Sequence, residues 1–485
     1  MKRHLSLFII CIFLVLMALF TYANASNFSD FADGSFPQKN AWTQAIPSVV
    51  WAGDPASLTT LNVNIVKRSD VKRVWLTSLG SDEPEGRREL FDDGTHGDQK
   101  AGDRVFTLAE VLLPSNLANL DLNSGACEWW GFLRVETKDG KLLGNNFGMI
   151  IGMVDPKYKD AFPVKEFGKG LYATPYAFFI QDSKREVISN YPVSNVTCGT
   201  GNYNAYKKLY SIYPDAFDFA SLMPGMQIFR PKDMAESVPY CIMVSNKVKN
   251  IGLPLMDNTK RFGSSGRLAS VQYSSFGCVD IADHEIGHTW GMALGKKLGL
   301  LKEKGDVSLG HWNSLSDVSG QMGAFFFAGD KIGQFAYNGD GIWRLIPNTT
   351  VKPYSPLELY VMGLIPSSEI PDVHLLEDPD LSDPERITAE SQKTFTAEEI
   401  VKSAGGERIP SAGESRKDFR LAFIVTQDLP YNDAAFAYFS LLSMKLADKG
   451  PPSGHSMLAP FHWATGGRAT LDTFLGNLET KVPAK

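Results

Sequence analysis

Two histidines four residues apart, with a glutamate directly after the first, have the types and the spacing for metal chemistry. They are His284, Glu285 and His288. In a helix, residues four apart lie on one face, one turn apart, so both imidazoles could bind one tetrahedral zinc ion. The carboxylate between them would lie beside the open coordination position, where it could take a proton from a water molecule. The pattern predicts a zinc site with two histidine ligands and Glu285 as general base.

A helix is the element that would hold these residues in place. Apolar residues at 281, 282 and 286 favour a helix around the motif. Upstream, residues 240–245 and 269–273 are apolar runs, and a polar, glycine-rich stretch separates them. We expect the order strand, loop, strand, metal helix, with an edge strand that could pair with an extended peptide. The alternative is a buried amphipathic helix whose histidines hydrogen-bond to neighbouring groups.

Several further segments resemble a family of secreted bacterial zincin-like proteins. Thr289-Trp290-Gly291 extends the likeness to the HExxHxxG pattern of the metzincin branch, but position 294 is Leu, where that branch has its next ligand. The other segments that carry the resemblance are a His-Trp at 311–312, SPLELYVMGL at 355–364, and stretches at 396–401 and 464–471. The resemblance covers most of residues 160–480. It implies an α+β zincin-like metallopeptidase domain.

A catalytic zinc ion usually has three protein ligands and a water molecule, so a further ligand is needed. His311 is the leading candidate, because the resemblance places a His-Trp there and other zincin branches take a ligand at a similar distance beyond the helix. Carboxylates also bind zinc, and the residues that compete for this position are Glu303, Asp306 and Asp317. Met322 or Met362 could form a floor beneath the metal, and the sequence does not choose between them.

These features predict a secreted zinc-dependent endopeptidase in which Glu285 activates water and then protonates the leaving amine. The oxyanion stabiliser is not identified, and its candidate donors are Tyr354, Tyr360, His455 and His462. A second hypothesis is a cell-surface binding or adhesive protein with a structural zinc site, and a third is a hydrolase of small amides. The acid at position 285 favours hydrolysis, since a purely structural site needs no base.

Short alternating segments dominate residues 47–153. Apolar and polar side chains alternate over 61–66, 71–76 and 132–137, with turn residues such as Asp139-Gly140 between such runs. This spacing predicts an all-β sandwich.

An acidic, glycine-rich run lies inside this region, at residues 90–107. It resembles a DDGxxGDxxAGDGxFT segment of immunoglobulin-like domains in secreted bacterial proteins, with Arg104 in place of a glycine, and so implies an immunoglobulin-like sandwich. Four carboxylates could supply several of the oxygens that calcium requires: Asp92, Asp93, Asp98 and Asp103. The alternative is a pair of tight turns whose aspartates accept hydrogen bonds from their own backbone.

The remaining boundaries follow from composition. Residues 26–46 are small and polar and are expected to be a linker. We assign residues 154–485 to the zincin-like domain. Within it, the stretch near 366–393 is rich in Pro, Asp, Glu and Ser without a clear period, and is expected to be a surface loop.

Residues 1–25 have the pattern of an export signal. A basic start precedes an apolar run at 5–20, and Ala23-Asn24-Ala25 is a small-x-small cleavage site. The apolar run is shorter than the roughly 20 residues of a membrane span. We therefore expect a secreted, periplasmic or extracellular protein with no membrane span after cleavage. Four cysteines would remain and could form two disulfides in such a compartment: Cys127, Cys198, Cys241 and Cys278.

The length and the charge of the chain limit the number of domains and the classes of partner that we expect. A chain of 485 residues is too long for one core and predicts two or three domains. Its formal net charge is −6, and loss of the two basic residues of the signal would make it −8. An acidic chain without a cluster of Lys and Arg among aromatics does not suit a nucleic acid partner. The expected partner is a protein or peptide substrate.

Overall fold

A computed structural model describes most of the chain between residues 41 and 484. The described residues are 41–65, 68–78, 87–114, 125–184, 187, 202–225, 240–273, 282–291, 293–301, 311–323, 326–328, 331–337, 343–347, 352–380, 382–383, 386–451 and 460–484. Within them the chain is rich in strands and forms several sheets around separate cores, as expected of a mostly-β protein of several domains. The predictions that concern residues outside these ranges are the export signal, residues 26–40 of the expected linker, Glu303, Asp306, His455, Cys198 and Cys278.

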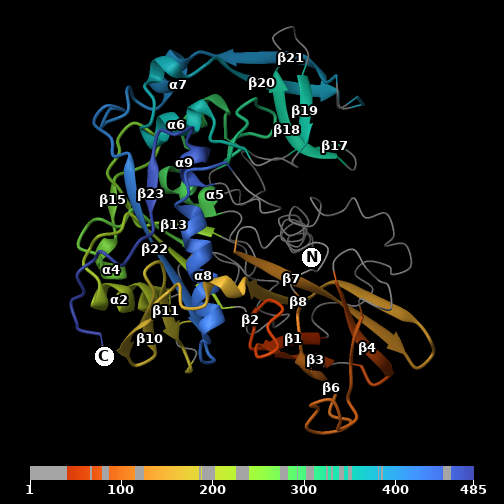
Figure 1. Ribbon diagram of the computed structural model, residues 1–485. Coiled ribbons are helices and arrows are strands. Elements are labelled where there is room, and N and C mark those ends of the chain that lie inside the picture. The colour runs from red at the N-terminus through yellow and green to blue at the C-terminus, as the bar shows by residue number, and fades with distance from the viewer. Residues whose placement is uncertain are drawn as a thin grey trace.

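The N-terminal part is built from two sheets that share one hydrophobic core (Figure 1). In strand β3 every second residue is buried, so one face supplies the core, as the alternation predicted. Two sheets around a common core agree with the expected sandwich, and the immunoglobulin-like assignment stays a prediction. The first sheet has the order β1 (Ala41–Ile46), β3 (Thr59–Ile65), β6 (Val105–Val111), and the second β2 (Val49–Trp51), β8 (Leu142–Val154), β7 (Ala126–Thr137), β4 (Val71–Ser78), β5 (Arg88–Leu90).

The end of the expected linker is part of this sandwich. Residues 41–46 form β1, which pairs with β3 in antiparallel register from Ala41 opposite Ile65 to Ile46 opposite Thr60. Small alternating residues, with Ala41, Thr43 and Ala45 turned inward, gave this strand too little hydrophobic contrast to be recognised in the sequence.

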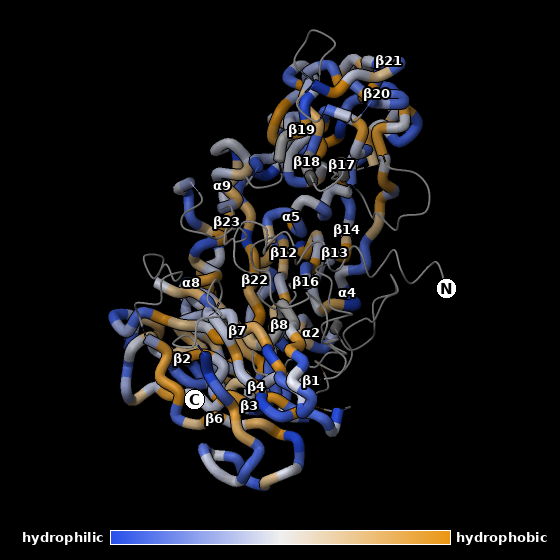
Figure 2. Tube along the Cα trace, turned by 90° about the vertical axis from the view of Figure 1, so that its right-hand side faces the viewer, coloured by the Kyte–Doolittle hydropathy of each residue, from blue (hydrophilic) through white to orange (hydrophobic). Residues whose placement is uncertain are grey.

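An eight-stranded mixed sheet forms the centre of the second part. Strand β22 lies inside it and runs parallel to its neighbours β11 and β12 and to the short β23. Central parallel strands are covered on both faces, which is why β22 is buried over nearly all its length and is coloured hydrophobic over much of it in Figure 2. The order is β13 (Tyr240–Met243), β16 (Ser270–Tyr273), β12 (Phe219–Pro224), β22 (Asp418–Gln427), β11 (Phe178–Gln181), β10 (Leu171–Ala173), β9 (Lys165–Gly168), with β23 (Thr470–Asp472) beside β22.

Helices cover both faces of this sheet. Alternate residues of β22 point to opposite sides, so Ala422 and Ile424 join one core while Phe423 and Val425 join the other. Helices α2 (Asn202–Ile212) and α4 (Thr259–Phe262) pack on the first side. The second side carries α5 (Ala282–Gly287), α6 (Pro356–Met362), α7 (Ala397–Ser403), α8 (Asp433–Leu446) and α9 (Phe461–Ala464).

Helix α8 also packs against the N-terminal sandwich. Tyr438 is fully buried, and its hydroxyl donates to Glu128 Oε1 of β7 at 2.7 Å. A Cβ placed on Gly152 of β8 would lie 3.1 Å from the Tyr438 ring, so the strand and the helix are in close contact. The Asn432 side chain donates to Val49 O of β2 at 2.9 Å. The two parts of the chain therefore share α8.

The stretch expected as a surface loop near 366–393 is instead largely a β-hairpin. Strands β20 (Val373–Asp380) and β21 (Thr388–Phe395) pair antiparallel. Most side chains of β21 are exposed on both faces, so the strand has no apolar alternation by which it could have been recognised. Beside it lies a small sheet of β17 (Phe326–Ala328), β18 (Lys331–Tyr337) and β19 (Trp343–Pro347), at the top of Figure 1.

Three short elements complete the part near the sheet edge. Strands β14 (Ser245–Asn246) and β15 (Met256–Asp257) pair with each other, and the 3-10 turn η7 (His288–Trp290) follows α5. None of the helices in the described part of the chain combines the length and the apolar composition that a membrane-spanning helix requires.

Candidate metal centre

The expected helix is present around the motif, but it is short. Helix α5 ends at Gly287, and His288 begins the 3-10 turn η7, which stops at Gly291 with a positive φ of 45°. Ala282 and Ile286 are buried in the main core, which anchors the helix and leaves the histidines on its other side half-buried. A helix of six residues is not stable by itself, so this packing is what stabilises α5.

Three histidines converge beside this helix. The ring centroids of His284, His288 and His311 lie 4.9 to 5.0 Å apart. One ring nitrogen of each lies within 4.8 Å of the others, and the Nε2 atoms of His284 and His311 are 3.0 Å apart. Zinc–nitrogen bonds of about 2.0–2.1 Å in tetrahedral geometry place two ligand nitrogens roughly 3.3 Å apart. The three imidazoles therefore fit one ion of this kind with little movement.

The tautomer of His284 suits a metal ligand. Its Nδ1 lies 2.6 Å from Gln321 O, and because a carbonyl oxygen only accepts, Nδ1 carries the hydrogen. The lone pair is then on Nε2, the atom that faces His311. A backbone carbonyl that orients the far side of a histidine is a usual feature of metal sites.

Burial keeps the site uncharged in the absence of an ion. It lowers the pKa of His284 to about 4 and that of His288 well below its ordinary value, so both rings are neutral near pH 7. Neutral imidazole is the form that binds a metal ion.

Glu285 has a buried oxygen without a partner. Its side chain is only 4% exposed, and among the described residues nothing hydrogen-bonds to Oε2. Burial raises the pKa of this carboxyl to about 8. A buried polar atom without a partner calls for an explanation. A water molecule on an ion held by the three histidines would be one such partner, so the residue types present fit a hydrated metal ion.

The segment that carries His311 is held by a residue that sequence reasoning missed. Glu358 of α6 is fully buried and accepts from Met322 N at 2.7 Å and from Trp312 Nε1 at 3.2 Å. Its other oxygen accepts from Ser355 N at 2.6 Å, which closes a capping box at the start of α6. The spacing Ser355-Pro-Leu-Glu358 is a readable capping box, but nothing in it reveals that the glutamate also binds a distant loop.

The segment 312–322 approaches Glu358 closely. A Cβ on Gly320 would lie 2.4 Å from Glu358 Oε2, so only glycine fits there without a shift of the backbone. Trp312 is fully buried, and its backbone N–H donates to Met322 O at 3.0 Å. Glu358 thus ties together both ends of the segment 312–322 and fixes the residue next to His311.

Met322 and Tyr354 lie beneath the metal helix. A Cβ on Gly287 would be 2.6 Å from Met322 Sδ and 3.1 Å from the Tyr354 ring. The Tyr354 hydroxyl donates to Asp283 O. Of the two candidate methionines, Met322 therefore packs under the helix between the two histidines, whereas Met362 lines a pocket beyond η7.

Asp317, which competed with His311 as the third zinc ligand, and the candidate oxyanion donors all have other partners. Asp317 accepts from His374 N and pairs with His374 Nδ1, both at 2.8 Å, and is not part of the histidine group. Among the candidate oxyanion donors, the hydroxyls of Tyr354 and Tyr360 donate to Asp283 O and Glu407 Oε2, and His462 Nδ1 contacts Ala469 O. The oxyanion stabiliser remains unassigned.

Three of the four aspartates considered for calcium lie together: Asp92, Asp98 and Asp103. Each accepts hydrogen bonds from nearby backbone, such as Gly102 N to Asp92 at 2.7 Å and Gly94 N to Asp98 at 2.7 Å. The fourth, Asp93, accepts from Thr95 instead. This is the arrangement that the tight-turn alternative predicts.

Cys241 is a free thiol on the edge strand β13. The two disulfides that would use all four remaining cysteines are therefore not both formed.

Comparison of the chain with protein families, with curated proteins and with solved structures gave no match. The functional assignment consequently depends on the geometry of the chain itself.

Proposed function

We propose that the chain is a zinc-dependent endopeptidase. The single observation that carries the proposal is the convergence of His284, His288 and His311, with Glu285 directly after His284 in the same helix and its buried Oε2 without a partner among the described residues. Three nitrogen ligands and one adjacent acid are the donor set of a hydrolytic rather than a closed structural zinc site.

In this proposal the histidines and Glu285 would have different roles. The three histidines would hold the ion, and zinc bound there would supply an acidified water molecule and polarise a carbonyl group. Glu285 would take the proton of the attacking water and pass it to the leaving amine. Burial raises the pKa of Glu285 to about 8 in the protein without an ion, and a bound cation would lower this pKa again and make the carboxylate available as a base.

A peptide substrate is supported by the sheet edge. Strand β13 is the last strand on its side of the large sheet, paired only with β16 among the described strands. It also packs against η7, the turn that begins with His288. An extended peptide that added to this edge would gain backbone hydrogen bonds and pass close to the histidines. The export signal expected from residues 1–25 would carry such an enzyme out of the cytoplasm.

Replacement of Glu285 by Gln tests the proposal. The variant keeps the size of the side chain but removes the base, so we expect it to retain bound zinc and melting temperature while cleavage falls by about 10²–10⁴-fold. The measurement is the cleavage rate on a denatured protein or peptide library, with zinc content determined in parallel. Glu398→Gln, an exposed change at the start of α7, is the matched control.

Two results would count against the assignment. Equal cleavage by wild type and Glu285→Gln would exclude Glu285 as the base. A zinc-loaded wild type that cleaves none of the substrates would favour the binding-protein hypothesis instead.

A further inference from the structure

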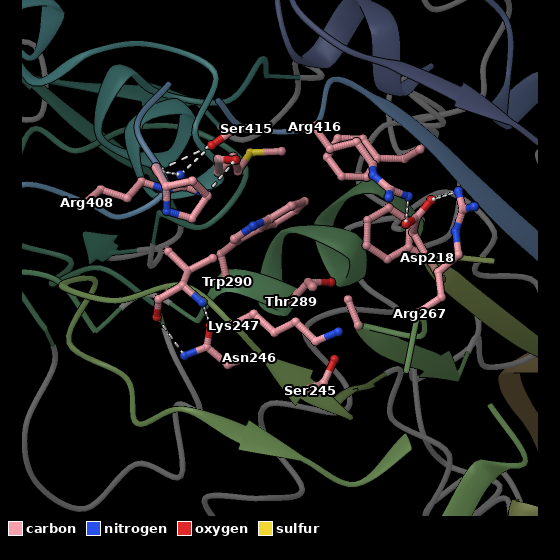
Figure 3. Close-up of a pocket in the computed structure, with 16 residues that line it drawn as sticks. Asp218, Ser245, Asn246, Lys247, Arg267, Thr289, Trp290, Arg408, Ser415 and Arg416 are labelled. Carbon is pink, nitrogen blue, oxygen red and sulfur yellow. Dashed lines mark hydrogen bonds and ion pairs between the residues drawn. The ribbon is translucent and has the colours of Figure 1, made fainter. Parts of the chain in front are cut away.

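A cavity of about 240 Å³ lies beside the turn that follows the metal helix. Residues at the starts of β12, β16 and β22 and residues of η7 line it, and Figure 3 shows their side chains. This basic pocket is lined by Asp218, Phe219, Ser245, Asn246, Lys247, Val248, Arg267, Ala269, Thr289, Trp290, Met362, Arg408, Pro410, Ser415, Arg416 and Phe419.

The charges on its wall do not balance. Four cationic side chains line the pocket, and Asp218 is the one carboxylate among the lining residues. Arg267 and Arg416 both pair with Asp218, at 3.0 and 2.5 Å, as Figure 3 shows. In a chain whose net charge is negative, such a local excess of positive charge would attract an anion.

Arg408 lacks a counter-charge. It is only 5% exposed, and its guanidinium donates to neutral acceptors, Val361 O, Met362 O and Pro410 O among them. Among the described residues no carboxylate lies within ion-pair distance of it. Burial lowers its pKa to about 10, so it is still a cation near neutral pH. A buried cation with only neutral partners is costly, and an anionic ligand would offset that cost.

Two further donors are available to a ligand. Arg267 Nε is buried and has no hydrogen-bond partner among the described residues. Lys247 is exposed, and its ammonium makes one hydrogen bond, to Gly266 O at 2.7 Å, which leaves two of its three donors. These groups could bind the oxygens of a carboxylate.

The opposite wall is aromatic. Phe219, Trp290 and Phe419 contact one another with ring centroids 5.3 to 5.9 Å apart. Phe219 is fully buried and Trp290 and Phe419 are 7% and 8% exposed, so the aromatic surface that faces the pocket is narrow. A bare inorganic anion would leave this surface uncovered, whereas an organic acid with one apolar group would cover it. The volume is below the roughly 300–1,000 Å³ of pockets for drug-sized ligands, so the ligand is about the size of one amino acid residue.

We infer that the basic pocket binds a single apolar group that carries a carboxylate. A free small acid and the C-terminal residue of a peptide share this chemistry. The site is independent of the proposed hydrolysis, because its donors and its aromatic wall include none of the three histidines and not Glu285.

Titration calorimetry on the full chain tests the inference. The chain carries Glu285→Gln, so that no peptide is consumed, and the probe is N-acetyl-phenylalanine. We expect saturable binding to this acid and binding at least about tenfold weaker to its neutral amide, which cannot form charge-assisted hydrogen bonds. A phenylalanine-terminated pentapeptide distinguishes the sources: equal or tighter binding indicates a peptide terminus, and binding of the small acid alone indicates a free acid.

Lys247→Ala is the informative variant, because this side chain is exposed and two of its three donors are left for a ligand. We expect at least about tenfold weaker binding of the acid. Lys249→Ala removes the same charge outside the lining and should bind within about twofold of the parent. If Lys247→Ala does not fold, Lys247→Gln takes its place, since it keeps most of the side chain and removes the charge.

Three results would overturn the inference: no binding of N-acetyl-phenylalanine at millimolar concentration, equal binding of acid and amide, or unchanged binding in the folded variant. Tighter binding of inorganic phosphate than of the organic acid would overturn the ligand class. None of these results depends on peptidase activity, so the failure of one proposal leaves the other standing.

Discussion

In the proposed zinc site His311 would supply the third nitrogen ligand, and it is the residue by which this site can be tested most directly. We expect His311→Ala to weaken zinc binding by more than the roughly 10–100-fold that loss of an outer partner costs, because a direct ligand is removed. Zinc content after dialysis and competition with a chelator measure this change. His374→Ala is the control, since that histidine pairs with Asp317 away from the group. Unchanged zinc affinity would remove His311 from the site.

Glu358 should make stability depend on pH. Burial raises its pKa from the ordinary 4.5 to about 7, so the folded protein holds a proton that the unfolded chain has released. The folded state is therefore favoured at low pH, and this contribution is lost as pH rises from about 4.5 to 7. Its size is about 3 kcal/mol at most.

The measurement compares wild type with Glu358→Gln in urea unfolding at pH 5 and pH 8, both without metal. Gln does not titrate, so we expect the wild type to lose stability relative to the variant as pH rises. Glu285, whose pKa is also raised, is common to both proteins and largely cancels in the difference. A difference that is the same at both pH values would show that Glu358 does not titrate in this range.

At the residue scale, the sequence revealed the candidate site residues that lie close together along the chain. His284, Glu285 and His288 could be assigned because helical spacing alone brings them together. His311 needed a family resemblance, since no periodicity connects it to the helix. Glu358 was quoted only as part of a segment, because its bonds to Trp312 and Met322 exist only after the chain has folded.

Among the elements, strand β1 decides where the N-terminal sandwich begins. A mature chain that starts at residue 47 lacks this strand, and β3 then loses an antiparallel partner. We expect a lower melting temperature, at a cost of about 0.5–1.5 kcal/mol for each lost ladder hydrogen bond. A chain that starts at residue 41 is the control, and it should melt at a higher temperature than the chain that starts at residue 47. Equal melting of these two chains would mean that β1 adds nothing.

The aspartates in the turns of residues 92–103 should stabilise the fold by accepting hydrogen bonds from backbone N–H groups. Asp98 is buried and accepts from Gly94 N and Lys100 N, so Asp98→Ala removes two hydrogen bonds whose donors belong to exposed residues. We expect a loss of about 0.5–1.5 kcal/mol for each of them. Millimolar calcium should leave the melting temperature of the wild type unchanged. An increase with calcium in the wild type that Asp98→Ala lacks would assign a calcium site instead.

The β20–β21 hairpin shows where prediction from pattern fails at this scale. A strand is recognised by one apolar face, and β21 has none. The hairpin is specified instead by pairing across its two strands, such as the ion pair of Lys393 with Glu377 at 2.5 Å, and such pairs cannot be read before the register is known.

At the scale of the whole molecule, helix α8 packs against both of the parts that the sequence analysis treated as separate domains. Eleven of its residues are buried, around its full circumference, so it needs cover on two sides. The large sheet covers one side and β2, β7 and β8 cover the other. The sequence placed the boundary between the two parts near residue 154, but it gave no sign that a helix near residue 440 would pack against both.

Strand β22 also sets the order of folding. Its partners β11 and β12 are complete by residue 224, but β22 itself begins at residue 418 and lies between them. The two early strands cannot be joined until nearly the whole chain is available, and pairing at such a separation is slow. If the expected export signal takes the chain through a membrane channel from its N-terminus, the central strands of the large sheet can pair only after β22 has emerged, and helix α5 gains its packing against that core only then.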